Sequence, residues 1–335
     1  GKPVGELVFC RQDWNGDFTV ENLVLAYVYK MVVLPMHESK EVYVNANSGE
    51  IIIEMPLATN CINNSGNTSW YGSQNFKAEW FGWPNSAFFL ESICTGRPHI
   101  RSRRGDPILP YNYGNATTSW VDPDGTNGYN QKAGVTTYYG LNKAYDYYDV
   151  IHNRKSYNNS NGTLDAYSEI TGGLWLSSSE NASWNFVTHH MSFGAGGTNG
   201  PLDDWNSLST VGHELTHGVV QFTAGLAYSQ ESGALNESFA DIFGEMIEYH
   251  TTGSTPNWNL EGSGMNIIRS LSNPNANNDP DTYLGSMWWP ASNSVDNYGV
   301  HTNSGVQNHW FYLLSEGATG TNDHGQDYSV TGIGI

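Results

Sequence analysis

The chain has 335 residues and a formal net charge of −19, because 33 Asp and Glu residues outnumber 14 Lys and Arg residues. A surface this acidic repels phosphate groups, which argues against a nucleic-acid-binding protein. The length and the 38% hydrophobic content allow a buried core in two or three domains and argue against a disordered chain.

The first segment, residues 1 to about 56, alternates apolar and polar residues in the manner of β-strands. Its longest apolar run, residues 23–34, is interrupted by Lys30 and followed by Pro35. That run predicts a buried strand, and no membrane span is expected. Strands predicted at 41–45 and 50–54 flank Asn47-Ser48-Gly49, where a glycine that tolerates positive φ predicts a hairpin.

The region from residue 57 to about 128 is rich in Asn, Ser, Gly and aromatic residues, which predicts short strands joined by turns. Residues 57–67 are predicted to be an exposed linker, because 60–67 are polar and lack periodicity. Three cysteines, Cys10, Cys61 and Cys94, match no zinc or redox spacing. Cys61 and Cys94 could pair in an oxidising compartment, and three free buried thiols are an equal alternative.

Apolar residues recur near a period of 3.6 in three later segments, which predicts helices at 132–151, 207–224 and 235–250. Gly225 is placed to end the second of these helices. Because strands come first and helices later, the order favours an α+β fold with segregated halves.

The second predicted helix contains the sequence His213-Glu214-Leu215-Thr216-His217. Histidines four residues apart project from one helix face, so they can bind a single zinc ion while Glu214 lies beside the attacking water. Glu237, on the third predicted helix, can supply the third protein ligand of a catalytic zinc site. The alternative is a solvated helix face with two ordinary histidines.

Asp241 lies one turn beyond Glu237 and can accept the free N–H of a ligating histidine, which would fix the tautomer of that ring. The alternative for Asp241 is a solvent-facing carboxylate early in a helix.

Several longer strings surround these residues. They are VGHELTHGV (211–219), GLAY (225–228), ESGALNE (231–237) and DIFG (241–244), with YDYY (145–148), HNR (152–154), RSL (269–271) and GVHTNSG (299–305) on either side. On these strings the chain, from roughly residue 67 to its end, resembles the thermolysin family of secreted zinc neutral endopeptidases. The resemblance implies zinc on His213, His217 and Glu237, Glu214 as general base and acid, and Asp241 as the residue that orients His213.

The same resemblance assigns five further residues. Tyr228 and His301 would stabilise the oxyanion, and Asp296 would hold His301. Asn181 and Arg269 would bind the substrate backbone. Without the resemblance, Tyr228 and His301 would be ordinary core or loop residues.

The first segment resembles the end of the propeptide module that precedes such proteases, a module that inhibits the enzyme and is removed by self-cleavage. The alternative is an extra β layer of the catalytic domain. The implied organisation is the end of a propeptide (1–56), a processing region (57–67), a β-rich N-terminal half (68–206) and a mainly helical, truncated C-terminal half (207–335). The implied fold is α+β, with a small α+β propeptide remnant and with the zinc-binding helix between the two halves.

Calcium binding by this chain is doubtful. Ser209 stands where the family usually has an acidic residue of a double calcium site, and Asn257 and Asn266 stand where carboxylates are common. Glu248 remains as the one calcium-ligand candidate, and calcium prefers several carboxylate oxygens.

The expected function is therefore that of a secreted zinc endopeptidase, made as a precursor and processed by itself. Its expected partners are protein and peptide substrates and its own propeptide as an intramolecular inhibitor, with no nucleic acid and no membrane. One alternative is a latent or truncated form whose zinc has only a structural or binding role. A second alternative is an exopeptidase, although no residue suited to capture a free amino terminus is recognised.

Overall fold

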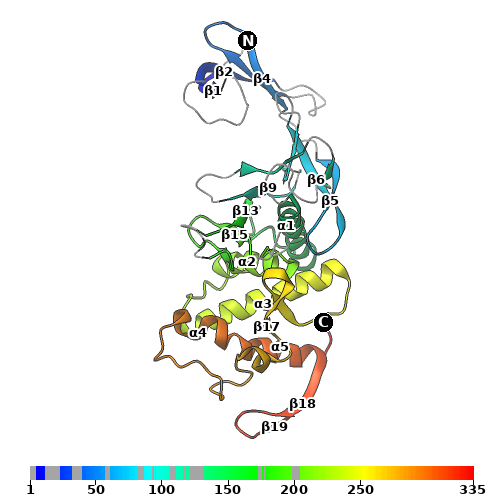
Figure 1. The fold of residues 1–335 in the computed structure, drawn as a ribbon, viewed down its shortest axis with the longest axis vertical. Helices are drawn as coiled ribbons and strands as arrows, with labels where there is room; N and C mark the ends of the chain where they lie inside the picture. The colour runs from blue at the N-terminus through cyan, green and yellow to red at the C-terminus, as the bar shows by residue number, and fades with distance from the viewer. Residues whose placement is uncertain are drawn as a thin grey trace.

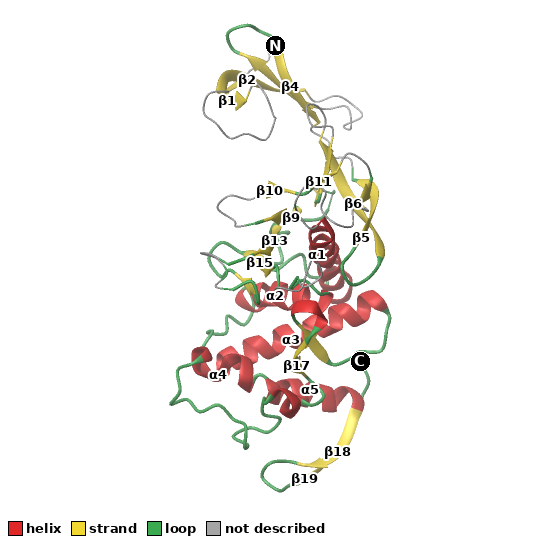
Figure 2. Ribbon diagram, in the orientation of Figure 1, coloured by secondary structure: helices red, strands yellow, loops and turns green. Residues whose placement is uncertain are grey.

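The computed structural model describes residues 5–11, 23–31, 40–56, 61–81, 87–92, 94, 96–105, 111–115, 118–120, 131–172, 176, 178–197 and 204–335. Figure 1 shows a small sheet at the N-terminal end, a β-rich region with a long helix next to it, and a helical region that ends in a hairpin. Figure 2 shows that strands predominate in the first half of the chain and helices in the second. This is the α+β organisation that the sequence predicts.

The first segment forms one antiparallel sheet in the order β1-β2-β3-β4. Its strands are β1 (Glu6–Arg11), β2 (Leu23–Met31), β3 (Lys40–Asn45) and β4 (Ile51–Pro56). The predicted hairpin is confirmed, because β3 pairs with β4 across a turn in which Gly49 has a φ of 74°. The described part of this segment is strand and turn, so the helix expected of a small α+β unit is not among its described residues.

The prediction of an exposed linker is wrong for residues 62–67, which form β5 (Ile62–Asn67). This strand belongs to a five-stranded sheet of order β11-β7-β6-β5-β12, with β6 (Ser73–Phe81), β7 (Ala87–Phe89), β11 (Gly114–Asn115) and β12 (Ser119–Trp120). Two residues of β5 contact the buried side chain of Trp120. Asn64 Oδ1 accepts a 3.1 Å hydrogen bond from Trp120 Nε1, and a Cβ at Gly66 would lie 2.8 Å from the Trp120 Cβ.

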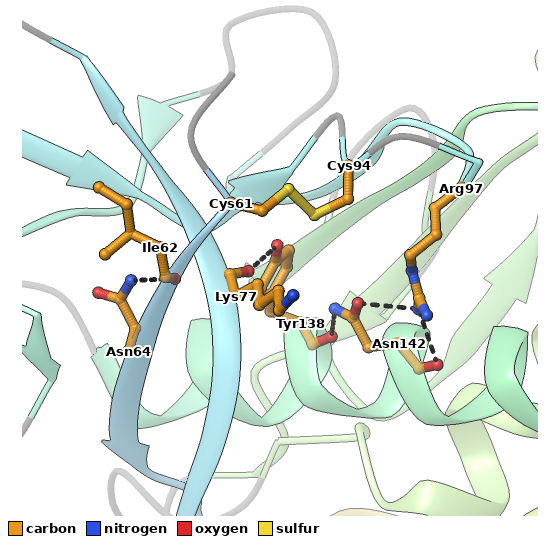
Figure 3. The surroundings of a disulfide bond; sticks show 8 residues. All are labelled: Cys61, Ile62, Asn64, Lys77, Cys94, Arg97, Tyr138 and Asn142. Atoms are coloured by element: carbon orange, nitrogen blue, oxygen red, sulfur yellow. Dashed lines mark hydrogen bonds between the residues drawn. A yellow bond between two sulfur atoms is a disulfide. The ribbon is translucent and has the colours of Figure 1, made fainter. Parts of the chain in front are cut away.

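A disulfide joins Cys61, just before β5, to Cys94, which lies 33 residues later. The pairing that the sequence left open is therefore the one formed. Figure 3 shows the bond above helix α1 (Gln131–His152), whose Tyr138 donates a 2.6 Å hydrogen bond to the carbonyl of Lys77. Beside it, Arg97 Nη2 donates to Asn142 Oδ1 at 3.2 Å, so two further contacts tie this region to the helix.

The central sheet is mixed and has the order β10-β9-β13-β15-β14, with β8 paired to β9. Its strands are β8 (Glu91–Ser92), β9 (Ile100–Arg104), β10 (Tyr111–Asn112), β13 (Leu164–Ile170), β14 (Ala182–Trp184) and β15 (His190–Gly194). Fully buried residues of the sheet, including Ile100, Leu164 and Phe193, share one core with Tyr138 and Leu141 of α1. In this order β14 is an edge strand.

The second half is built around two packed helices, α2 (Leu208–Gln221) and α3 (Gln230–Thr252). The remaining elements are β16 (Asn259–Glu261), β17 (Ile267–Ser270), α4 (Asp296–Asn303), α5 (Gly305–Glu316), β18 (Gly317–Thr321) and β19 (Asp327–Thr331), with short 3₁₀ turns at Ser263–Met265 and Pro274–Asn277. The three predicted helices are confirmed, although α3 begins five residues earlier than expected. Within the described residues, no helix combines the length and apolar character needed to cross a membrane.

Candidate metal centre

Three predicted zinc ligands lie together in the buried space between α2 and α3. His213 Nε2 lies 3.0 Å from His217 Nε2 and 3.5 Å from Glu237 Oε2, and His217 Nε2 lies 3.4 Å from Glu237 Oε1. Two ligand atoms about 2.0–2.1 Å from a tetrahedral zinc ion lie about 3.3–3.4 Å apart. The donor atoms present therefore lie close to the separations that a zinc ion requires.

Two glycines allow this convergence. Gly212 of α2 lies against Gly244 of α3, and a Cβ at Gly212 would lie 3.1 Å from the Gly244 Cα. A Cβ at Gly244 would lie only 2.4 Å from the carbonyl oxygen of Ser209. Any larger residue would push the helices apart, and so would separate the two histidines on α2 from the carboxylate on α3.

Each histidine has a buried oxygen next to its other ring nitrogen. His213 Nδ1 lies 2.9 Å from Asp241 Oδ1, as the sequence predicts for this carboxylate. His217 Nδ1 lies 2.7 Å from Asn236 Oδ1, a contact that the sequence reasoning missed although Asn236 directly precedes Glu237. An acceptor at Nδ1 leaves Nε2 free to bind a metal ion.

Two buried carboxylates in the centre are held ionised. Burial opposes the charge of Glu237, but the facing His301 and His217 rings bring the pKa of this carboxyl well below its ordinary value. Burial also opposes the charge of Asp241, but the Arg269 guanidinium lowers its pKa to about 2. Both groups can therefore act as anionic partners of a cation.

Glu214 lies on the same helix as the two histidines and lines the same cavity. Its Oε2 atom is buried and has no hydrogen-bond partner among the described residues. Burial raises the pKa of this carboxyl. A carboxylate with one unused oxygen and a raised pKa is suited to accept a proton from water.

Tyr228, His301 and Asp296 form a connected group on the other side of the ligands. The Tyr228 hydroxyl lies 3.2 Å from His301 Nε2 and donates a short hydrogen bond to Glu237 Oε1. Asp296 accepts from the His301 backbone N–H at 2.9 Å and from its Nδ1. The family resemblance predicts this arrangement, in which Asp296 holds His301 and His301 lies next to Tyr228.

A cavity of about 470 Å³ opens over the centre and is lined by both predicted substrate-binding residues. Asn181 is exposed at its edge, next to β14. Arg269 is almost fully buried, and it pairs with Asp241 through Nε at 2.8 Å and Nη2 at 2.7 Å. The sequence reasoning did not identify Phe186 and Trp205, which also line the cavity.

At the expected calcium site, the polar side chains hydrogen bond to neighbouring protein groups. Ser209 Oγ and Asn257 Nδ2 each donate to Glu261 at 2.7 Å. Glu248 accepts from the Ser209 N–H and from the Tyr71 hydroxyl, both at 3.2 Å. Asn266 is exposed and donates to the carbonyl of Ser263, so it lies outside this group.

The sequence reasoning missed two carboxylates of this group. Glu261 accepts the two hydrogen bonds just described, and Glu245 accepts a 2.9 Å hydrogen bond from the backbone N–H of Trp258. Both are buried. The spacing in the sequence could have identified Glu245, because this residue lies eight residues, or about two helical turns, beyond Glu237.

Two family models match the chain: "thermolysin metallopeptidase, catalytic domain" over residues 100–221, and "thermolysin metallopeptidase, alpha-helical domain" over residues 224–335. The thermostable neutral protease NprT of Geobacillus stearothermophilus is 37% identical over 245 residues, which cover 69% of this chain and 41% of that protein. Thermolysin of Alicyclobacillus acidocaldarius subsp. acidocaldarius matches with the same identity and coverage. The chain therefore spans about two fifths of the length of these curated relatives.

A solved structure is also similar. It is the precursor of protealysin, a metalloproteinase from Serratia proteamaculans, with a TM-score of 0.50 and 25% sequence identity. The match covers 67% of this chain and 70% of that one.

Proposed function

Because the chain belongs to the thermolysin family of metallopeptidases, we propose that it is part of a zinc-dependent endopeptidase that hydrolyses internal peptide bonds of proteins. One observation carries the proposal. Glu214, whose buried Oε2 has no hydrogen-bond partner among the described residues, lines the same cavity as the metal-ligand candidates His213, His217 and Glu237. A purely structural zinc site would need neither this oxygen nor an open cavity.

His213, His217 and Glu237 would hold the zinc ion, which when bound polarises the scissile carbonyl and lowers the pKa of water. Glu214 would take a proton from the attacking water and deliver it to the leaving amine. Tyr228 and His301 would donate hydrogen bonds to the oxyanion of the tetrahedral intermediate. Burial, and then the nearby Glu237, raises the pKa of Tyr228, which keeps its hydroxyl protonated and able to donate.

The substrate would lie extended along β14, an edge strand whose residues line the cavity. The Asn181 side chain would hydrogen bond to the substrate backbone. Arg269 holds Asp241 through Nε and Nη2. It also lines the cavity, where it would bind the substrate backbone. An endopeptidase needs such an open groove, whereas an exopeptidase would need a group that closes one end.

The proposal includes a secreted precursor whose residues 1–56 are removed by cleavage. Similarity to a protealysin precursor supports this organisation. The Cys61–Cys94 disulfide supports secretion, because disulfides persist mainly in oxidising compartments. Zinc is the only cofactor proposed, since donors already occupy the carboxylates of the expected calcium site.

The decisive experiment compares Glu214→Ala with the wild-type chain for zinc content and casein hydrolysis. We expect Glu214→Ala to retain one zinc per chain and to lose hydrolysis by at least about a hundredfold, since general acid–base catalysis supplies roughly 10²–10⁴ in rate. Glu316→Ala is the matched control, because this exposed glutamate lies on α5 and does not line the cavity.

Each alternative result has a clear meaning. Comparable hydrolysis by Glu214→Ala would eliminate this residue as the base. Wild-type protein that binds zinc but hydrolyses nothing would identify the chain as a latent form with a binding or structural zinc.

A further inference from the structure

Asp241, the residue beside His213, has three different partners that together fix both of its oxygens. Oδ1 lies 2.9 Å from His213 Nδ1 and 2.7 Å from Arg269 Nη2. Oδ2 accepts from Arg269 Nε and from Asn308 Nδ2, both at 2.8 Å. Asn308 lies on α5, 67 residues beyond Asp241, and no sequence argument had identified it.

The orientation of the Asn308 amide is fixed from its other end. Its Oδ1 accepts a 2.7 Å hydrogen bond from the hydroxyl of Ser238. The ionised Asp241 carboxylate can only accept, so the amide nitrogen must face Asp241 and the amide oxygen faces the Ser238 hydroxyl. Asn308, Ser238 and Asp241 are all fully buried, so water does not replace either contact.

These contacts have a geometric consequence for the metal centre. Arg269 alone would restrain the Asp241 carboxylate within the plane of their two parallel hydrogen bonds but would leave Oδ2 without its second donor. A buried carboxylate oxygen that loses a donor carries an unmet desolvation cost. The carboxylate would then move to recover a partner, and the 2.9 Å approach of Oδ1 to His213 Nδ1 would change.

We propose that Asn308 is a positioning residue of the metal centre, which holds Asp241 in the orientation that aims His213 at the metal ion. The inference rests on the proposed zinc site but not on peptide hydrolysis. It also makes α5 a part of the centre, although none of its residues lines the cavity.

The test measures metal affinity, not activity. Asn308→Leu keeps the approximate volume of the side chain and removes both hydrogen bonds. We expect its zinc dissociation constant, measured by competition with a chelator, to rise about 3- to 10-fold, because losing a direct partner of a ligand costs about 10- to 100-fold and Asn308 acts one contact further out. The visible spectrum of the cobalt-substituted protein should change as well, because it reports ligand geometry. Gln307→Leu, a neighbouring change on α5 that does not touch Asp241, is the matched control.

A double-mutant cycle separates positioning from general damage to packing. If Asn308 acts through Asp241, then Asn308→Leu should weaken zinc binding little further in an Asp241→Asn background. An equal loss in both backgrounds, or a wild-type affinity and cobalt spectrum in Asn308→Leu, would overturn the proposal.

A second variant decides the matter if Asn308→Leu does not fold. Asn308→Ala removes the amide N–H that faces Asp241 and adds neither charge nor bulk. Zinc affinity within twofold of the wild type would refute the positioning role, and a greater loss would support it. Should the wild type bind zinc yet fail to cleave casein, the proposed function would fail while this inference would still be tested.

Discussion

Phe186 forms an aromatic wall close to the metal ligands. Its ring centroid lies 5.6 Å from that of Tyr228 and 6.2 Å from that of His217. Gln221 Nε2 fixes its backbone by donating a 2.9 Å hydrogen bond to its carbonyl. The ring is 37% exposed and lines the cavity, so it is placed to contact a side chain of a bound peptide.

We expect Phe186→Ala to lower kcat/KM for peptides with an aromatic residue beside the scissile bond by roughly 3- to 10-fold, since aromatic contacts contribute about 0.5–1.5 kcal/mol. Peptides with alanine at that position should be affected less. Val187→Ala is the control, because Val187 is 84% exposed on the same turn and does not line the cavity. Equal losses for both peptides would mean that Phe186 supports the centre and does not select substrates.

The sequence allowed the ligands on α2 to be derived physically, because a regular helix converts the His213 and His217 spacing into a distance. It did not allow this for Asp296 and His301. Between them, Asn297, Tyr298 and Gly299 have φ values of 47°, 69° and 81°. With Asp296 at a φ of 56°, four successive residues are left-handed and form a turn of the opposite hand to an α-helix, which no hydrophobic periodicity predicts. Only the family resemblance predicted that these two residues belong to the site.

At the scale of the elements, helices with a buried stripe were predictable and short strands were not. The helix at 131–152 packs against sheet strands and against α2, so residues 133–141 are all buried, but its regularly spaced apolar residues made it recognisable. The strand β5 could not be recognised, because its inward residues are Asn64 and Gly66. The sequence shows their polarity, but only tertiary contacts show that they accommodate Trp120.

The carboxylate group where α2, α3 and β16 meet has consequences for stability. Burial, with repulsion from Glu261 second, raises the pKa of Glu248 to about 7. Burial raises the pKa of Glu245 to about 7 as well. Because the folded state binds these protons more tightly than the unfolded state does, their stabilising contribution is complete below the ordinary pKa near 4.5 and is lost as pH rises toward 7.

We therefore expect the free energy of unfolding to fall by a few kcal/mol between about pH 4.5 and pH 7 through these two groups, since one pKa unit corresponds to about 1.4 kcal/mol. The double variant Glu245→Gln, Glu248→Gln mimics the protonated forms and should lose this part of the pH dependence. Urea unfolding across the pH range would measure the free energy of unfolding of both proteins.

Calcium chloride should leave the melting temperature of the zinc-loaded wild type unchanged, and a rise of several degrees would show that this carboxylate group binds calcium.

At the scale of the whole molecule, the disulfide restrains a part of the chain that has few helices. It holds the start of β5 next to the segment that leads into β9, and so links two sheets through a 33-residue separation. The helical half has no disulfide among its described residues, and there a bound zinc ion would join α2 and α3 through His213, His217 and Glu237. The two halves of the molecule would then be stabilised by different chemistry.

Replacing both cysteines, as in Cys61→Ser with Cys94→Ser, should lower the free energy of unfolding by about 2–4 kcal/mol, because the unfolded chain would regain the freedom of the closed loop. Urea unfolding of the zinc-loaded protein would measure the loss. Wild-type protein kept reduced by a phosphine should show a loss of similar size. If neither sample is less stable than the oxidised wild type, the disulfide does not contribute to stability.

The same disulfide affects how a cut in the polypeptide chain would be detected. A peptide bond cut anywhere between residues 62 and 93 divides the backbone inside the loop, yet the two pieces remain covalently joined through Cys61 and Cys94. Such a nicked molecule keeps the mass of the intact chain apart from one added water, and it separates into two fragments only after reduction. For a protein proposed to cut peptide bonds, a single band on a non-reducing gel is therefore no proof of an uncut chain.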